Sequence, residues 1–328
     1  MTDEIQSRGA QGRVADAPRR HWVYRTLPRA AWPYAQLARW DRPIGWELLL
    51  WPCLWSAALA ALALPQADAP WWGMLPDPWH TVLFLVGAVA MRGAGCTYND
   101  IVDERIDASV ERTRSRPLPS GQVRRRQAWA FLAAQCLVGL AVLVQFNPFT
   151  IGLGLVSLLV VALYPFMKRI TDWPQFVLGL AFSWGALMGW AAVHGSIGAP
   201  AVLLYAASVM WVIGYDTIYA HQDKEDDALV GVRSTARLFG DDTKSWLAGL
   251  YGGALVLMAS SFALAGAPLP AMAGLLAAAV HFTRQIRVLD IDDPEQCLRL
   301  FRSNGQVGWL IFAGLVGAGL WAGVKPLV

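Results

Sequence analysis

The most informative feature of the sequence is its division into long apolar blocks separated by polar segments. Each block has about 20 mostly apolar residues, the length that an α-helix needs to cross the hydrocarbon core of a bilayer. Almost all charged residues lie in the gaps between the blocks. Nine blocks follow this pattern, at about residues 44–64, 79–98, 127–146, 149–167, 174–193, 199–219, 246–265, 270–288 and 307–324. The pattern predicts an all-α polytopic membrane protein with nine transmembrane helices.

The N-terminal residues differ from the rest of the chain. Residues 1–29 are polar and rich in arginine, and they contain no apolar run of the kind found in a signal peptide. We expect a flexible cytoplasmic tail there. Residues 30–42 are amphipathic, with Trp32 and Trp40, as in a helix at the level of the lipid headgroups. The expected organisation is this tail followed by a single nine-helix transmembrane domain over residues 30–328.

Positive charge is distributed unevenly about the nine predicted spans. When the loops are assigned alternately to two sides, 26 of the 27 Lys and Arg residues fall on the side of the N-terminus, and only Lys325 falls opposite. Basic loops remain in the cytoplasm. We therefore expect the N-terminus and all long loops to be cytoplasmic, in a bacterial inner membrane, with membrane lipids as partners and no nucleic-acid partner.

The composition supports this class of protein. The chain is 55% hydrophobic and only 16% charged, which is too apolar for an ordinary soluble domain of 328 residues. Its four cysteines show no metal-binding spacing and lie mostly in apolar segments, so we interpret them as thiols packed among the helices. A soluble globular protein is therefore excluded.

A first group of acidic and amide side chains follows the second apolar block. Asn99, Asp103 and Asp107 are spaced by four residues, and Asp100 lies three residues before Asp103. On a helix both spacings place the side chains on one face. Carboxylates this close repel one another unless a cation lies between them. Oxygen ligands of this kind suit a hard cation such as Mg²⁺, which often also contacts a substrate phosphate.

A second group repeats the pattern 120 residues further along the chain. Its members follow the sixth block at spacings of three, four and four, and they are Asp216, Tyr219, Asp223 and Asp227. Two arginines spaced by four follow each group: Arg112 with Arg116, and Arg233 with Arg237. The repeat predicts two facing acidic helix ends on the cytoplasmic side. The alternative is that each group is a solvated, charged loop.

The two acidic groups and their flanking arginines could together bind the head of an amphiphilic diphosphate in a membrane-embedded cavity. Metal ions and basic side chains stabilise the charge that develops on a departing diphosphate. Loss of diphosphate from an allylic chain leaves a resonance-stabilised carbocation, which suggests prenyl transfer. The residues alone indicate a Mg²⁺-dependent enzyme or carrier for a lipid diphosphate. The expected fold is nine transmembrane helices around a central cavity with cytoplasmic cap loops.

Longer motifs extend over nearly the whole chain after the tail. They are Arg39-Trp40-Asp41-Arg42-Pro43-Ile44-Gly45 with Leu50-Trp51-Pro52, Asn99-Asp100-x-x-Asp103-x-x-x-Asp107, Tyr164-Pro165-Phe166-Met167-Lys168-Arg169, and Tyr215-Asp216-Thr217-x-Tyr219-Ala220-x-x-Asp223-x-x-Asp226-Asp227. Through these motifs the sequence resembles the UbiA-type intramembrane prenyltransferases. Within that family it is most similar to the branch that prenylates 4-hydroxybenzoate in ubiquinone biosynthesis.

The resemblance implies a reaction and a cofactor. A polyprenyl group passes from an allylic polyprenyl diphosphate to the ring carbon ortho to the hydroxyl of 4-hydroxybenzoate, and diphosphate is released. Two Mg²⁺ ions are implied, held by two half-sites. The implied metal-binding residues are Asn99, Asp100, Asp103 and Asp107 in one half-site and Asp216, Asp223 and Asp227 in the other.

The resemblance also implies roles for basic and catalytic side chains. The implied diphosphate-binding residues are Arg112, Arg116, Lys168, Arg169 and Tyr219. The expected catalytic residues are Asp103, Asp216 and Asp223, with Asp216 as the candidate base for the phenol or the arenium intermediate. Arg39 or Arg42 is expected to bind the carboxylate of the acceptor.

Two alternatives remain at this point. A multi-pass transporter of an anionic substrate also combines internal repeats with intramembrane charges. Against it, the side opposite the N-terminus has short loops with almost no charge, namely Asp68, Asp77 and Lys325. A prenyltransferase of the same family that acts on another acceptor, in the menaquinone or haem pathway, is the second alternative.

Overall fold

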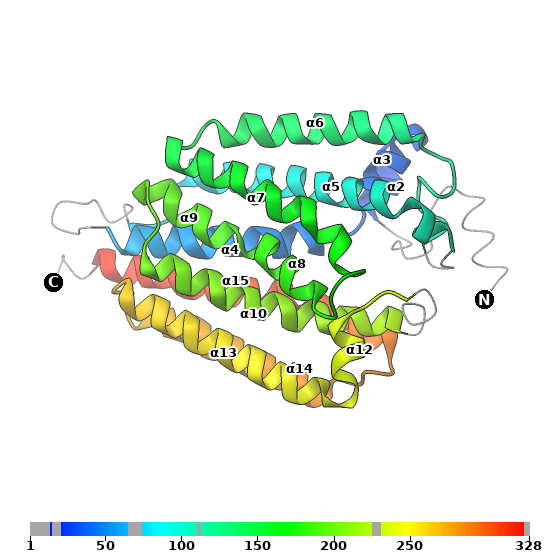
Figure 1. Cartoon of the computed structure of the whole chain (residues 1–328). Coiled ribbons are helices and arrows are strands. Elements are labelled where there is room, and N and C mark those ends of the chain that lie inside the picture. Colours follow the sequence, from blue (N-terminus) through cyan, green and yellow to red (C-terminus); the bar gives the residue numbers. More distant parts are fainter. Residues whose placement is uncertain (1–13, 15–20, 65–73, 110–112, 225–230, 325–328) are drawn as a thin grey trace. The chain divides into compact units, whose positions relative to one another are not determined.

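The structure is a computed structural model that describes residue 14 and residues 21–64, 74–109, 113–224 and 231–324 (Figure 1). Every regular element within these residues is a helix, which confirms the all-α class. The long helices are α4 (Ile44–Leu62), α5 (Pro78–Ser109), α6 (Arg125–Leu143), α7 (Pro148–Met167), α8 (Pro174–Ser183), α9 (Gly185–His194), α10 (Ala199–Ala220), α13 (Thr243–Leu264), α14 (Pro270–Val288) and α15 (Pro294–Val324). The short ones are α2 (Trp22–Thr26), η1 (Arg29–Ala31), α3 (Trp32–Leu37), η3 (His221–Asp223), α12 (Thr235–Phe239) and η4 (Gly240–Asp242).

The number of spans differs from the prediction. In the part of the chain that the structure describes, eight helical segments are long and apolar enough to cross a membrane, so the count of nine is not confirmed. The helix that falls short is α14, because its C-terminal half carries His281, Arg284 and Arg287. The membrane-protein class stands on the other eight segments.

Several helix boundaries also differ from the prediction. The helix α5 does not end at the first acidic group but continues through it to Ser109. The predicted loop 289–305 is mostly helical, since α15 begins at Pro294. The predicted fifth span is two helices, α8 and α9, that meet at Trp184. Pro52 lies inside α4 without ending it.

The chain forms two compact units. The first contains residues 1–47 and 86–142, and the second contains residues 48–85 and 143–328. Both α4 and α5 contribute residues to each unit. The predicted division of the chain at residue 29 stays a prediction.

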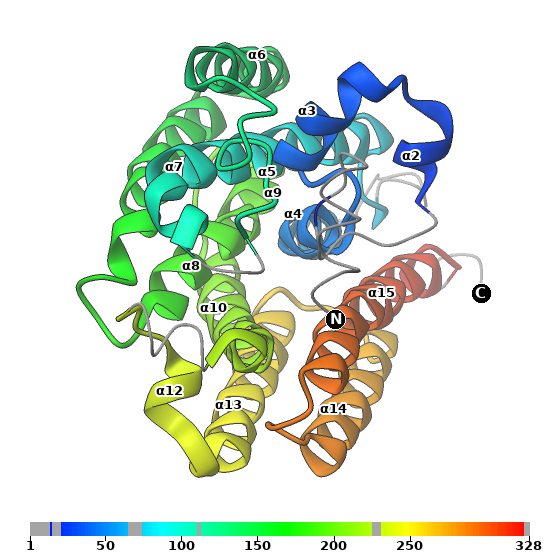
Figure 2. The same cartoon turned by 90° about the vertical axis from the view of Figure 1, so that its right-hand side faces the viewer.

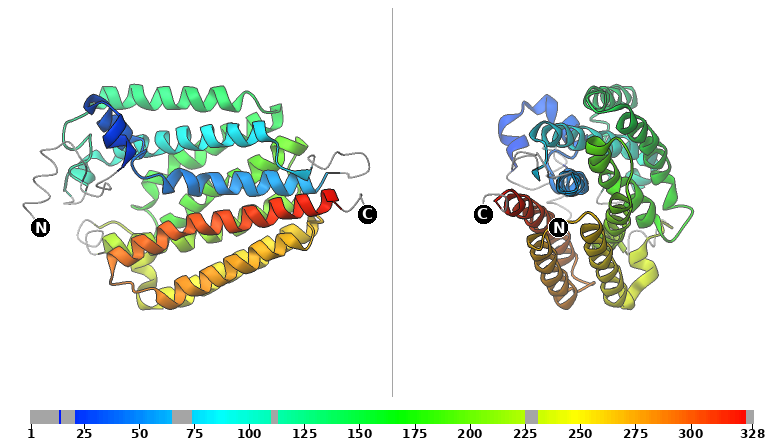
Figure 3. Two further views of the ribbon diagram at one scale, coloured as in Figure 1. Left: turned by 180° about the vertical axis from the view of Figure 1, so that it is seen from behind. Right: turned by 90° about the vertical axis from the view of Figure 1, so that its left-hand side faces the viewer.

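In the second unit α10 is the central helix. It packs against α8, α9, α13 and α15, while α14 packs against α13 and α15. Figures 2 and 3 show α13, α14 and α15 running beside one another. The helices α14 and α15 approach closely because glycines face each other: a Cβ on Gly314 would lie 2.9 Å from the Cα of Gly274. Buried aromatic rings fill the remaining space, among them Trp55, Trp211 and Tyr251.

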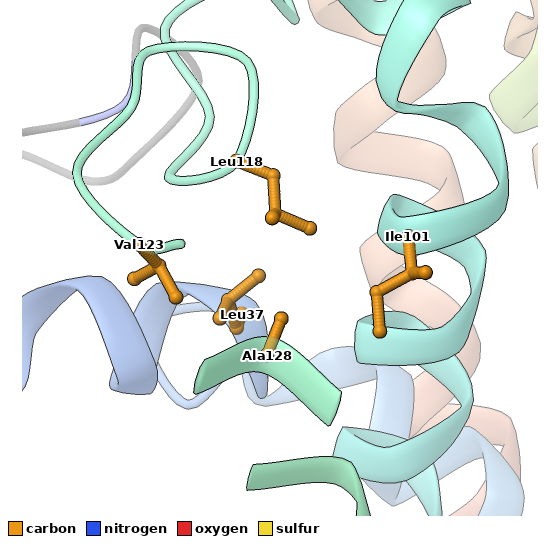
Figure 4. Close-up of a cluster of buried hydrophobic side chains, with 5 residues drawn as sticks. All are labelled: Leu37, Ile101, Leu118, Val123 and Ala128. Atoms are coloured by element: carbon orange, nitrogen blue, oxygen red, sulfur yellow. The ribbon is translucent and has the colours of Figure 1, made fainter. Parts of the chain in front are cut away.

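In the first unit the C-terminal part of α5 packs against α6, α3 and the segment 113–124. Figure 4 shows the apolar cluster at this junction, which consists of Leu37, Ile101, Leu118, Val123 and Ala128. Closer to the N-terminus of α5, the Gln135 amide of α6 donates to the Thr97 hydroxyl at 3.1 Å. These contacts fix the helix that carries the first acidic group relative to its own loop.

The end of the predicted tail is structured. Residues Trp22–Thr26 form α2, in which Val23 and Tyr24 are buried against α3. The Tyr24 hydroxyl donates to the buried carboxylate of Asp41 at 2.8 Å. Burial and this carboxylate raise the pKa of Tyr24 above its usual value, so the phenol remains a donor. Helix α2 therefore lies within the last part of the segment for which a flexible tail is expected.

Candidate active site

The first acidic group lies on the last turns of α5. Asp100, Asp103 and Asp107 are all buried there, and Asn99 is half-buried. Carboxylates near a helix C-terminus are unfavourable by themselves, because the backbone dipoles give that end a partial negative charge. Burial adds a further desolvation cost unless a cation neutralises them. The site therefore requires cations.

Two arginines supply this positive charge. The Nη1 of Arg116 lies 2.8 Å from Oδ2 of Asp107 and 3.5 Å from Oδ1 of Asp100, so a single nitrogen bridges two carboxylates. The Nη2 of Arg39 lies 2.7 Å from the same Oδ1 of Asp100. The structure thus brings together four of the predicted site residues in one buried cluster.

The cluster still offers oxygen atoms to a metal. Oδ2 of Asp100 is buried and has no hydrogen-bond partner in the structure. Three buried carboxylates on one helix, together with the Asn99 amide, match the hard oxygen donors that Mg²⁺ prefers. Within the described residues, no three acidic, histidine or cysteine side chains are already arranged around a common metal position. The donor set fits Mg²⁺, which these carboxylates and the Asn99 amide would hold.

The position of Arg39 depends on an unusual backbone conformation. Arg39 has a φ of 57°, the only positive φ among the described residues other than glycine. It ends α3: its N–H donates to the Gln36 carbonyl, and the next N–H, of Trp40, donates to Ala35 at 2.9 Å. Glycine is usual at this position of such a helix end. An arginine there costs about 1–2 kcal/mol, and its guanidinium offsets that cost through Asp100 and the Gln36 carbonyl.

The segment 113–124 positions Arg116. The Thr113 hydroxyl donates to the Asp107 carbonyl at 2.9 Å, and the Arg116 N–H donates to the Thr113 carbonyl at 2.9 Å. Leu118 and Val123 anchor the far side of the segment in the apolar cluster of Figure 4. The turn thereby returns the Arg116 side chain to the carboxylates of α5. Arg112 lies outside the described residues.

Arg42, the other predicted acceptor-binding residue, has a different partner. Its Nε lies 3.3 Å from Oδ1 of Asp41, the carboxylate that also accepts from Tyr24. Neither this contact nor that of Arg39 tests binding of an acceptor. Both assignments stay predictions.

The second acidic group lies at the end of α10 and in η3. Asp216, Tyr219 and Asp223 are half-buried. The Tyr219 ring packs on Phe301 of α15, with ring centroids 4.6 Å apart. Asp227 and its neighbour Asp226 lie outside the described residues.

Hydroxyl groups fix the helix end that carries this second group. Thr217 and Thr235 share a hydrogen bond of 2.6 Å between their buried hydroxyls. His221 is buried, with Nε2 3.0 Å from the Thr243 hydroxyl. A single histidine in a polar segment after a helix is usually expected to be solvated, but His221 is buried. Its partner Thr243 lies 22 residues further along the chain, so the sequence around His221 could not predict the contact.

Lys168 and Arg169 follow the C-terminus of α7. The Lys168 carbonyl accepts a hydrogen bond from the Arg233 N–H at 3.0 Å, which joins this turn to the segment after the second acidic group. Both predicted diphosphate-binding residues therefore belong to the same unit as Asp216 and Tyr219.

The long apolar helices define an α-helical membrane protein, and the end of α5 carries a buried cluster of carboxylates and arginines. Residues 49–313 match the UbiA prenyltransferase family. The chain belongs to this family.

Individual relatives support the same result. A curated protein of Drosophila pseudoobscura pseudoobscura, named "4-hydroxybenzoate polyprenyltransferase, mitochondrial", is 51% identical over 291 residues, which cover 88% of this chain and 71% of the relative. The apo structure of a UbiA homolog from Aeropyrum pernix K1 has a TM-score of 0.67 at 25% identity, over 83% of this chain and 97% of that one. A UbiA homolog from Archaeoglobus fulgidus bound to GPP and Mg²⁺ shares the fold, with a TM-score of 0.60 at 18% identity over 87% and 99% of the two chains.

These names correct one prediction. Relatives that are 45–51% identical to this chain are named as mitochondrial enzymes. The prediction of a bacterial inner membrane is therefore wrong, because the relatives point to a mitochondrial membrane. The placement in a membrane stands.

Proposed function

We propose that this chain is a 4-hydroxybenzoate polyprenyltransferase of ubiquinone biosynthesis. It transfers a polyprenyl group from an allylic diphosphate to the acceptor ring carbon ortho to the hydroxyl, and it releases diphosphate. The observation that carries the proposal is the identity of 51%, over 88% of this chain, with a curated enzyme of that name.

Two Mg²⁺ ions are proposed as cofactors. One half-site consists of Asn99, Asp100, Asp103 and Asp107, and the other of Asp216, Asp223 and Asp227. When bound, Mg²⁺ supplies positive charge that stabilises diphosphate as a leaving group. The archaeal homolog bound to GPP and Mg²⁺ supports a divalent cation in this fold, and the buried, unpartnered oxygen of Asp100 supports the first half-site.

Basic side chains bind the diphosphate oxygens in this proposal. They are Arg112, Arg116, Lys168 and Arg169, with the Tyr219 hydroxyl as a further donor. Guanidinium groups suit this role because their donors match the geometry of phosphate oxygens.

The reaction forms one carbon–carbon bond and breaks one carbon–oxygen bond. The allylic carbon leaves the diphosphate oxygen, and the acceptor ring carbon attacks the allylic cation. The ring then loses the proton of that carbon, for which Asp216 is the proposed base. Arg39 or Arg42 binds the acceptor carboxylate. Asp103 and Asp223 are proposed as catalytic through the metal ions that they hold.

A panel of acceptors tests this assignment against a family member with another acceptor. Purified protein is given an allylic polyprenyl diphosphate and Mg²⁺ with 4-hydroxybenzoate, a dihydroxynaphthoate or haem. We expect diphosphate release that depends on 4-hydroxybenzoate. Release with another acceptor alone would change the acceptor and keep the reaction class.

The transporter is tested in parallel. Solute counterflow into liposomes without any diphosphate release would show that the protein is a carrier and not an enzyme. We expect release and no counterflow.

A further inference from the structure

We propose that Arg39 and Arg116 are internal counter-ions of the first acidic group. While no metal is bound, they pair with Asp100 and Asp107. When Mg²⁺ binds these carboxylates, the two arginines bind the diphosphate instead. The two arginines then couple metal loading to diphosphate binding, and Arg42 is the candidate that is left for the acceptor carboxylate. The inference rests on the proposed function for the identity of the anion.

The geometry of Arg116 is the first observation. Its Nη1 contacts carboxylate oxygens of both Asp100 and Asp107. Asp100 and Asp107 lie two turns apart on the same face of α5, and this one positive nitrogen neutralises both. A metal ion at the same place and this guanidinium nitrogen exclude each other, because each needs the same oxygens and their charges repel.

The second observation is that Asp100 and Arg116 each have a buried polar atom without a hydrogen-bond partner. Oδ1 of Asp100 receives both arginines, whereas its Oδ2 is buried without a partner. The Nε of Arg116 is also buried without a hydrogen-bond partner. Both partners of this ion pair therefore lack a bond that a buried polar group normally makes. A phosphate oxygen could accept from the Nε of Arg116, and a metal ion could bind Oδ2 of Asp100.

The backbone allows the exchange without unfolding. The main chain around Arg116 is held by Thr113 and by the apolar anchors Leu118 and Val123. The side chain alone needs to move. Arg39 is fixed through the end of α3, so its guanidinium swings about a backbone that stays in place.

The test uses purified full-length protein with Mg²⁺ and inorganic pyrophosphate as probes. Arg116→Gln removes the bridging cation. Arg39→Gly removes the second cation at a φ of 57°, which glycine adopts without strain. Arg125→Gln is the matched control, because Arg125 pairs with Glu104 of α5 at 2.6 Å in a more exposed place.

Calorimetric titration gives two affinities for each protein. We expect Arg116→Gln and Arg39→Gly to bind Mg²⁺ about tenfold more tightly than the wild type, because a competing cation is gone. At saturating Mg²⁺ we expect both to bind pyrophosphate about tenfold more weakly. Arg125→Gln is expected to change neither affinity. Mg²⁺ binding that is unchanged or weaker in Arg116→Gln would overturn the proposal, as would equal shifts in the control.

A double-mutant cycle keeps the proposal testable if these variants fold poorly. It combines the milder changes Arg116→Lys and Asp107→Asn, with thermal unfolding as the readout. We expect a coupling of about 2–4 °C in chelator, and none with Mg²⁺ and pyrophosphate. The same coupling in both conditions would mean that the arginine stays on the carboxylate. Neither readout involves 4-hydroxybenzoate or turnover, so an error in the acceptor assignment gives a separate result.

Discussion

At the scale of single residues, the site is defined as much by its cations as by its carboxylates. Asp100 and Asp107 are tolerated in a buried helix end because Arg39 and Arg116 neutralise them. Arg39 reaches this position only from a backbone conformation that most residues avoid. The positive φ at Arg39 therefore accompanies the placement of its guanidinium on Asp100.

The strain at Arg39 can be measured directly. Arg39→Ala and Arg39→Gly both lose the guanidinium, but only alanine keeps a Cβ at φ 57°. We expect Arg39→Gly to be more stable than Arg39→Ala by about 1 kcal/mol. Thermal unfolding in chelator checks this. Equal stability of the two variants would show that the backbone there is relaxed.

The acidic side chains carry the second residue-scale prediction. Asp103→Ala or Asp223→Ala is expected to abolish turnover without unfolding the protein, because each removes a proposed metal ligand. Asp241→Ala is the control, since Asp241 is exposed. Turnover assays alongside thermal unfolding check both halves of the statement. Retained turnover in either variant at ordinary Mg²⁺ contradicts the two-half-site arrangement.

At the scale of elements, helix ends carry the site and neighbouring elements hold the ends. The last turns of α5 are fixed by the segment 113–124, and the end of α10 by hydroxyl contacts to α12 and α13. The buried His221–Thr243 bond is the sharpest example, because it joins the middle of the second acidic motif to the first turn of α13.

Removal of that bond should destabilise the protein. Thr243→Val keeps the volume of the side chain but removes the hydroxyl that bonds both to His221 Nε2 and to the Gly240 carbonyl. Because His221 Nε2 is then buried without this partner, we expect a cost of about 1–3 kcal/mol. Ser260→Ala on the same helix removes an exposed hydroxyl that bonds only to the Val256 carbonyl, and it should cost less than about 0.5 kcal/mol. Chemical denaturation in detergent compares the two. Similar losses would mean that the histidine bond contributes nothing.

The apolar blocks predicted most elements, whereas their ends were predicted poorly. Periodicity cannot distinguish a charged loop from a helix whose acids are buried against arginines, and for this reason the extension of α5 to Ser109 was missed. The pairing of Arg39 with Asp100 joins residues 61 positions apart. Such contacts depend on tertiary packing and leave no local pattern. The acidic spacings predicted that Asp100, Asp103 and Asp107 share a helix face, and all three are buried on α5. Their role as metal ligands stays a prediction.

At the scale of the whole molecule, the topology depends on how many helices cross the membrane. Eight described segments are apolar enough, and α14 is not, although it has the length. The placement of 26 of the 27 basic residues on one side of the membrane requires nine crossings. We therefore predict that α14 also spans the membrane.

Cysteine labelling tests this topology. Single cysteines at Asp241, Ala267 and Asp292, in a background without the four native cysteines, mark the start of α13, the α13–α14 loop and the α14–α15 loop. We expect a membrane-impermeant reagent to label positions 241 and 292 from one side and position 267 from the other. Labelling of 267 and 292 from the same side would show that α14 does not cross.

The central claim is Mg²⁺-dependent prenyl transfer to 4-hydroxybenzoate. The most direct measurement gives purified protein an allylic polyprenyl diphosphate, Mg²⁺ and radiolabelled 4-hydroxybenzoate, with and without chelator. We predict that label enters the lipid phase and that chelator stops the transfer. Absence of transfer, together with absence of diphosphate release for every acceptor tried, would contradict the assignment of this chain as a prenyltransferase.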